Sequence, residues 1–60
     1  MILRQILISK GVKQKWLAQK LGVSEVTVSN WCKEKSDPSL RNIQRICEVL
    51  NTPQKELLNQ

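Results

Sequence analysis

The sequence has 60 residues, enough for one small hydrophobic core, so we expect a single domain that spans residues 1–60. Lysine and arginine number 10 against 5 acidic residues, a formal net charge of +5 that favours a polyanionic partner. The chain has no histidine, no tyrosine and no glycine-rich phosphate loop, and its acidic residues are scattered, so we expect neither an enzyme nor a cofactor.

The first two predicted helices are both scaffold elements with one apolar face. In the first helix the apolar residues at helical spacing are Ile2, Leu3, Ile6 and Leu7. Gly11 follows and can turn the chain at the end of this helix. In the second helix the inner residues are Leu17, Ala18 and Leu21. Gly22 then occupies the position where a left-handed residue ends a helix.

The third predicted helix begins directly after a very short turn. Ser24 is a favourable N-cap residue, so the helix is expected to start at Glu25 and to end at about Lys33. A polar stretch then leads to Pro38 and to Ser39, which can cap a fourth helix.

The last two predicted helices complete the core. The inner stripe expected for the fourth helix consists of Leu40, Ile43, Ile46, Cys47 and Leu50. Thr52 followed by Pro53 marks the start of a fifth helix. Its expected anchors are Leu57 and Leu58. Few helix breakers and no phenylalanine or tyrosine also favour an all-helical chain.

The sequence favours neither a membrane-spanning segment nor a metal site. The longest apolar runs, such as residues 6–8, are far shorter than the roughly 20 residues that cross a bilayer, so we expect a cytoplasmic protein with no membrane partner. Cys32 and Cys47 are far apart, and no histidine is present to complete a zinc site. We therefore expect two buried thiols and no bound metal.

The most informative segment is residues 14–31, which has the sequence QKWLAQKLGVSEVTVSNW. A small residue at Ala18 lets two helices cross closely, and Gly22 allows a sharp bend between them. Val28 is placed to fill the angle between these helices from the second of them. Together these three positions predict a helix-turn-helix unit at about residues 14–33.

Over essentially its whole length the sequence resembles the phage-repressor and Cro-like helix-turn-helix family, often called the XRE family. The residues that carry this resemblance are Gln14, Leu17, Ala18, Leu21, Gly22, Val23, Ser24, Val28, Ser29, Trp31, Pro38, Ser39, Leu40, Glu56 and Leu57. The resemblance implies an all-α, lambda-repressor-like bundle of about five short helices, with the helix from Glu25 in the major groove of double-stranded DNA. It also implies a small, nucleoid-associated transcriptional regulator of the repressor kind, encoded by a bacterium or a phage.

Two departures from the family pattern carry physical consequences. Members often have arginine where Leu7 stands and glutamate where Cys32 stands, which form a buried ion pair; here both partners are replaced together by apolar residues. The family also favours glycine where Glu34 stands. For residues 34–37 the sequence therefore leaves two alternatives, an extra helical turn or a strained residue.

The third helix carries the candidate base-reading residues. Helical geometry turns four of its side chains away from the inner face that holds Val28 and Trp31. These four residues are Glu25, Val26, Ser29 and Asn30. Asn30 is suited to adenine, Glu25 to the cytosine amino group and Val26 to a thymine methyl group. The alternative is a solvated helix face.

The second candidate set would contact DNA phosphates or flank the bases. Lys13 at the cap of the second helix and Lys15 in its first turn oppose the helix dipole, a penalty that a docked phosphate would reverse. The full set is Lys13, Gln14, Lys15, Ser24, Thr27, Lys33, Lys35 and Arg41. Solvated lysines are the alternative.

Three functions remain open at this point. The leading one is sequence-specific binding to double-stranded DNA as a homodimer, without a cofactor or small-molecule ligand. The second is a protein-interaction module, such as an antitoxin or adaptor, that uses Trp16 or the C-terminal helices. Trp31 is expected in the core, whereas Trp16 is expected to be partly buried, either as a cover for the core or as an anchor. The third is non-specific binding to DNA or RNA.

Overall fold

The computed structural model describes residues 1–58, which form five short helices. In chain order they are α1 (Leu3–Lys10), α2 (Gln14–Leu21), α3 (Glu25–Cys32), α4 (Leu40–Leu50) and α5 (Gln54–Leu57). Residues 1–58 contain no strand, so the predicted all-α bundle of about five helices is confirmed. No helix in the same stretch is long and apolar enough to span a bilayer.

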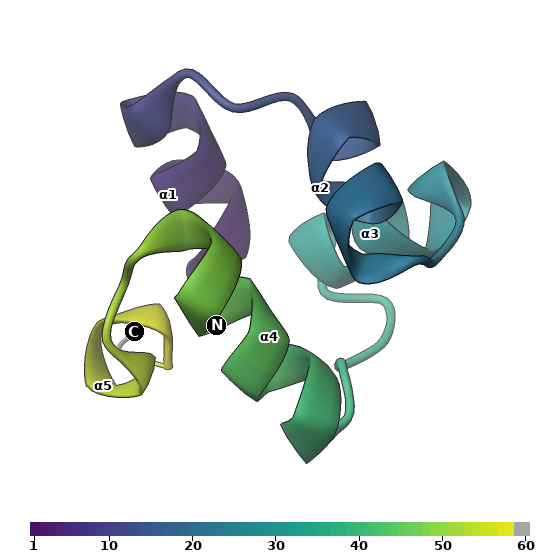
Figure 1. Cartoon of the computed structure of the whole chain (residues 1–60). Helices are drawn as coiled ribbons and strands as arrows, with labels where there is room; N and C mark the ends of the chain where they lie inside the picture. Colours follow the sequence, from purple (N-terminus) through teal and green to yellow (C-terminus); the bar gives the residue numbers. More distant parts are fainter. Residues whose placement is uncertain (59–60) are drawn as a thin grey trace.

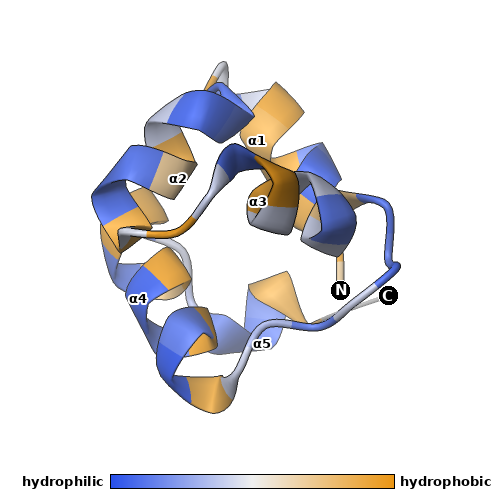
Figure 2. Cartoon of the chain, turned by 90° about the vertical axis from the view of Figure 1, so that its right-hand side faces the viewer, coloured by the Kyte–Doolittle hydropathy of each residue, from blue (hydrophilic) through white to orange (hydrophobic). Residues whose placement is uncertain are grey.

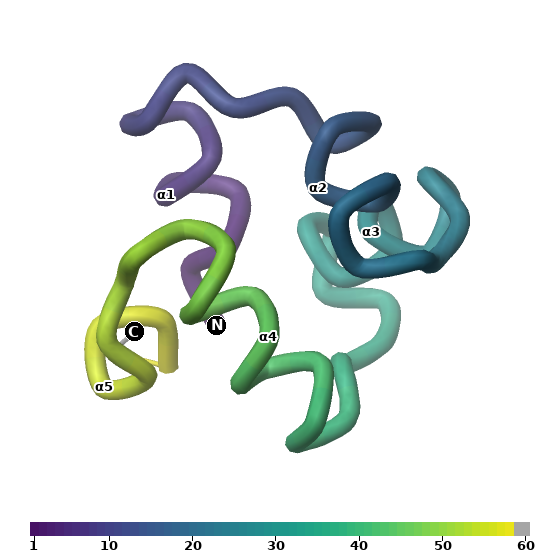
Figure 3. The backbone as a smooth tube through the Cα atoms, in the orientation of Figure 1, coloured from purple at the N-terminus to yellow at the C-terminus, as the bar shows by residue number. Residues whose placement is uncertain are grey.

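The helices are arranged around α4 and the α2–α3 pair. α2 packs against α3 and α4, α3 also contacts α1, and α4 contacts α5. Figure 1 shows α2 and α3 on one side of the molecule and α1 and α5 on the other. The tube in Figure 3 brings the start of the chain close to α5, where the Ile2 N–H donates to the Leu57 carbonyl oxygen at 3.1 Å. The α2–α3 pair is thereby left at one edge of the bundle.

One hydrophobic core receives residues from all five helices. Its buried members are Leu3, Ile6, Leu7, Leu17, Ala18, Leu21, Val28, Trp31, Ile46, Leu50 and Leu57. The predicted burial of Trp31 is therefore confirmed. Leu7 is buried in this core and Cys32 packs against it, so the paired loss of the family's charged residues leaves an apolar contact region.

Six residues that were predicted on the inner faces are more exposed than expected. Leu40 is 62% exposed because it is the first residue of α4, whose buried positions, Ile46 and Leu50, lie in its second half. Leu58 is 46% exposed because Leu57 takes the buried position, and adjacent helical residues face about 100° apart. The other four lie at the edge of the core and are only partly buried: Ile2, Cys32, Ile43 and Cys47.

Four helices are followed, at the C-cap or one residue after it, by a residue in the left-handed conformation, after which a backbone N–H bonds back into the last turn. These residues are Gly11 (φ 68°), Gly22 (φ 72°), Glu34 (φ 60°) and Asn51 (φ 52°). The closing N–H···O bonds, 2.9–3.1 Å long, run from Val12 to Leu7, Val23 to Ala18, Lys35 to Asn30 and Thr52 to Cys47. Of the two alternatives for residues 34–37, the chain adopts the strained residue, at Glu34, and no extra helical turn.

Candidate nucleic-acid interface

The α2–α3 unit is a tight helical corner held from several sides. Ala18 and Val28 are both buried between the helices, and Gly22 makes the left-handed turn that the sequence predicted. The Arg45 guanidinium donates to the Lys20 carbonyl oxygen at 3.1 Å and so ties α4 to the end of α2. Figure 2 views this edge of the molecule directly, with α3 at the centre and α2 beside it. The corner is therefore fixed by the core, while the outer face of α3 lies at the surface.

The N-terminal end of α3 is organised by Ser24. The Thr27 N–H donates to Ser24 Oγ at 3.1 Å, and the Ser24 and Thr27 hydroxyl oxygens lie 2.7 Å apart. This is the N-cap that the sequence predicted, and it satisfies one of the free donors at the helix start. Because the two hydroxyls bond to each other, the first turn of α3 has a defined geometry.

The four candidate base-reading residues lie on α3 with different exposures. Glu25 is exposed and Val26 is 68% exposed, whereas Ser29 and Asn30 are partly buried. Thr27, assigned to the flank, is also partly buried. α3 contains no lysine or arginine, and Glu25 is its one acidic residue. The outer face of α3 is therefore made of short polar groups, one carboxylate and one large apolar side chain.

The candidate phosphate-contacting cations lie before and after α3 in the chain, in the first turn and N-cap of α2 and in the segment from the end of α3 to the start of α4. The five flanking cations are all exposed: Lys13, Lys15, Lys33, Lys35 and Arg41. Gln14, in the first turn of α2, is partly buried, and Ser24 is exposed. Within residues 1–58 the single ion pair joins the Met1 amino group to Glu34 at 3.7 Å, so no acidic side chain in that part neutralises the flanking cations. Such cations are available to an anionic partner.

The start of α2 lacks the cap that α3 and α4 have. Lys13 occupies the N-cap position with extended backbone (φ −83°, ψ 146°), and its side chain makes no capping hydrogen bond. The first turn of α2 also has no acidic residue. Its backbone N–H groups are thus free to bind an anion, because both the helix dipole and the neighbouring lysines favour negative charge there.

Trp16 lies on α2 close to these lysines. It is 40% exposed, so it lies at the surface and is more exposed than the partial burial that the sequence predicted. Gly11, Val12 and Lys13 form a shallow hollow of about 320 Å³ beside it. The Lys20 ammonium lies 5.5 Å from the centre of the ring, a cation–π contact. Sequence reasoning did not single out Lys20, although its i, i+4 spacing from Trp16 is a usable signal.

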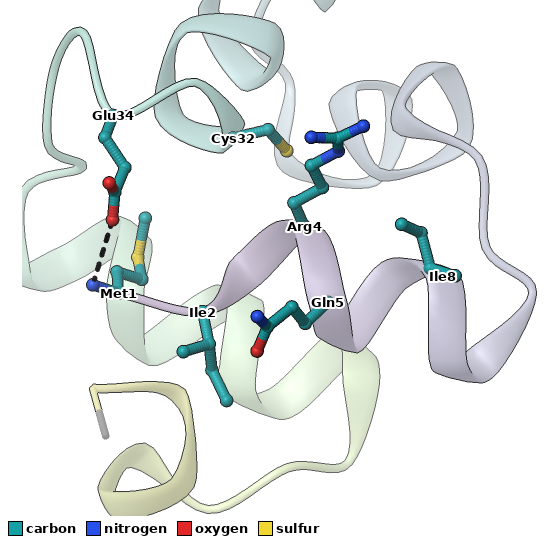
Figure 4. Close-up of a pocket in the computed structure, with 7 residues that line it drawn as sticks. All are labelled: Met1, Ile2, Arg4, Gln5, Ile8, Cys32 and Glu34. Atoms are coloured by element: carbon teal, nitrogen blue, oxygen red, sulfur yellow. Dashed lines mark ion pairs between the residues drawn. The ribbon is translucent and has the colours of Figure 1, made fainter. Parts of the chain in front are cut away.

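A second hollow, of about 390 Å³, lies between α1 and the end of α3 (Figure 4). Its lining consists of Met1, Ile2, Arg4, Gln5, Ile8, Cys32 and Glu34. Burial raises the pKa of the Cys32 thiol, while the Arg4 guanidinium acts weakly in the opposite direction. Burial also raises the pKa of the Cys47 thiol. Both thiols are therefore protonated at neutral pH, the form that is a poor nucleophile and a poor metal ligand.

The helix-turn-helix family matches the chain over residues 3–57, a stretch that includes all five helices. The comparison with curated proteins found no match. Within residues 1–58, no three histidine, cysteine, aspartate or glutamate side chains gather in a way that could hold a metal ion. Because the family match covers residues 3–57, the chain belongs to the helix-turn-helix family of the XRE type, which includes proteins similar to Cro and the lambda repressor. This is a family of DNA-binding transcription regulators.

Proposed function

We propose that this protein is a small, sequence-specific transcriptional regulator that inserts α3 into the major groove of double-stranded DNA. The observation that carries this proposal is the surface of the α2–α3 corner. α3 itself has no cation, whereas exposed lysines precede it at the start of α2 and follow it directly in the chain. A groove lined by bases, with phosphates along both edges, has the complementary arrangement.

Within this proposal the four residues of the outer face of α3 contact base edges. Asn30 offers an amide that can pair with adenine, and Glu25 offers a carboxylate that accepts from the cytosine amino group. Ser29 lies between them in the sequence and can donate or accept. In this proposal α3 enters the groove with its N-terminal end first, the end that Ser24 caps.

The flanking residues supply affinity in this proposal. Lys13, Gln14 and Lys15 at the start of α2 bind one phosphate together with free backbone N–H groups. Lys33, Lys35 and Arg41 follow α3 and contact phosphates on the other strand. Ser24 and Thr27, whose hydroxyls bond to each other, lie between the two groups at the edge of the groove.

One copy of such a module makes few base contacts, so we propose that two copies bind a DNA site with a dyad and repress transcription there by occupying it. No cofactor takes part in this function. The family is typically non-enzymatic, which agrees with the absence of histidine from the whole chain.

Selection of bound duplexes from a random pool, followed by titration of two variants, tests the proposal. Asn30→Ala should reduce discrimination at one base pair by about 1–3 kcal/mol and leave other positions unchanged. Lys13→Ala should weaken binding to all duplexes about equally and lower the salt slope, d log K/d log[salt], by about one unit. Lys55→Ala on α5 is the matched control, because α5 lies on the far side of the molecule from α3 in Figure 1.

The outcomes separate the three functions that the sequence left open. Enrichment of no particular duplex, with binding that still depends on salt, would indicate a non-specific nucleic-acid binder. If no nucleic acid binds at all, and Trp16→Ala abolishes capture of a protein partner, the interaction module is the correct function. The exposed part of Trp16 is the observation that favours this second candidate.

A further inference from the structure

Val26 is the one large apolar side chain on the outer face of α3. It is 68% exposed and does not belong to the core or to the residues packed against it within residues 1–58. Valine is a poor helix former because its branched side chain loses rotamer freedom in a helix. An exposed valine in the first turn of α3 thus stabilises neither the helix nor the core of this protein.

The polar groups next to Val26 in the sequence are a hydrogen-bonded pair of hydroxyls and a carboxylate. The Ser24 and Thr27 hydroxyls, on either side of it in the sequence, bond to each other at 2.7 Å. Glu25, the residue directly before it, is exposed and acidic. A partner atom that meets the Val26 side chain itself can make only apolar contact, because valine has no polar side-chain atom; of the two neighbouring hydroxyls, one still has a hydrogen to donate.

The residue composition of α3 limits which base can be recognised there. Guanine is most often read by a bidentate arginine or lysine, and α3 has neither. Among the four bases, thymine alone presents a methyl group in the major groove. An exposed valine and a thymine methyl group are a matched apolar pair.

We propose that Val26 is a specificity-determining residue that packs on the C5 methyl group of a thymine, so that each half-site carries a T·A pair opposite the first turn of α3. This inference rests on the proposed function, because it requires α3 to lie in the major groove. It adds the identity of one base pair and the atom that is recognised. Binding then depends on a single methyl group of the DNA.

The experiment removes that methyl group without changing base pairing. In the duplex selected from the random pool, each thymine is replaced in turn by deoxyuridine, and the dissociation constant is measured by fluorescence anisotropy. One position in each half-site should weaken binding about fourfold, the factor that corresponds to about 0.8 kcal/mol for one buried methylene group. Replacing that T·A pair by C·G and then by 5-methylcytosine·G should restore about the same factor.

Two variants show whether Val26 is responsible. Val26→Ala should bind the thymine and deoxyuridine duplexes equally, and it should remain folded because alanine favours a helix more than valine does. Ile8→Ala is the matched control: Ile8 is an apolar residue of α1 that is 69% exposed, and its loss should leave the fourfold effect intact. Circular dichroism checks the fold of both variants.

Each outcome bears on one proposal or on both. A preferred duplex with no methyl-sensitive thymine, or equal sensitivity in the wild type and Val26→Ala, overturns the assignment of Val26 and leaves α3 as the reading helix. If the pool yields no preferred duplex, both proposals are wrong. Loss of the fourfold effect in Ile8→Ala would also contradict the role of Val26, because the effect would then not be local to α3.

Discussion

Glu34 shows how a single residue can hold a backbone conformation that its type disfavours. Its φ of 60° lies in the left-handed region, which costs an L-residue other than glycine about 1–2 kcal/mol. The turn is nevertheless closed by two backbone bonds, from the Glu34 N–H to the Trp31 oxygen and from the Lys35 N–H to the Asn30 oxygen. The capping of the last carbonyls of α3 thus outweighs the local strain.

We expect Glu34→Gly to raise the free energy of unfolding by about 1 kcal/mol, because glycine adopts this conformation without strain. The ion pair between the Met1 amino group and Glu34 is lost in this variant, but it is largely exposed at the carboxylate and contributes little. Glu34→Ala is the matched control, since it loses the same ion pair and keeps the strained side-chain carbon. Equal melting temperatures for the two variants, measured by circular dichroism, would show that the backbone at Glu34 is not strained.

Whether a residue faces the core or the solvent could be predicted best where apolar residues recur at helical spacing within one helix. Ile46 and Leu50 fall one helical turn apart and are both buried, as predicted. Leu40 and Leu58 lie at helix ends, where periodicity has no second turn to confirm it, and both are exposed. The exposure of Val26 on α3 followed from its position relative to Val28, two residues along the same helix.

At the scale of single helices, starts and ends were largely predictable because their signals are local. Ser24 and Ser39 cap α3 and α4 through side-chain hydrogen bonds to Thr27 and Asn42, three residues further on. Gly22 ends α2 where the sequence placed the turn. A capping residue and its partner are at most a few residues apart, so no knowledge of tertiary packing is needed to recognise them.

The start of α2 has no side-chain cap and has lysines where the helix dipole disfavours positive charge. Lys13→Ser should supply the missing N-cap and raise the free energy of unfolding by about 1 kcal/mol, because Ser Oγ can accept from the first turn. The same variant should bind DNA more weakly if Lys13 contacts a phosphate. Thermal unfolding and DNA titration of one sample test both effects.

Ser39→Ala is the companion variant for this test. It removes an existing cap, the 3.2 Å hydrogen bond from the Asn42 N–H to Ser39 Oγ, and should lower the free energy of unfolding by about 1 kcal/mol. The DNA affinity of the folded protein should stay unchanged. If Lys13→Ser changes neither stability nor DNA affinity, the start of α2 is neither undercapped nor a phosphate contact. A gain of stability with unchanged affinity would remove the binding role alone.

At the scale of the whole molecule, the contacts that join distant parts of the chain could not be predicted. The Ile2 N–H bond to Leu57 and the Arg45 bond to the Lys20 carbonyl link residues far apart in sequence. Neither pair has a residue pattern that marks it, because any backbone carbonyl accepts such a bond. The resemblance supplied the number of helices, whereas the docking of α5 on the start of the chain required the structure.

These long-range contacts predict that α5, although it has only four residues, holds the whole domain together. Leu57 is fully buried among core residues, and its carbonyl accepts from Ile2 at the other end of the chain. Truncation of a buried leucine to alanine costs about 2–5 kcal/mol. A chain of 60 residues has a total stability of only about 3–9 kcal/mol. Leu57→Ala should therefore abolish most of the stability and unfold α3 together with α5.

Leu58→Ala is the matched control, because Leu58 is adjacent, chemically identical and 46% exposed. It should change the melting temperature only slightly, since surface substitutions lie within about 0.5 kcal/mol. Circular dichroism at 222 nm follows the helices of both variants, and tryptophan fluorescence in a Trp16→Phe background reports Trp31 and so the core around α3. If Leu57→Ala frayed α5 while Trp31 kept its native emission, the core would consist of independent parts. A single transition at lower temperature, seen by both probes, is the result that one continuous core requires.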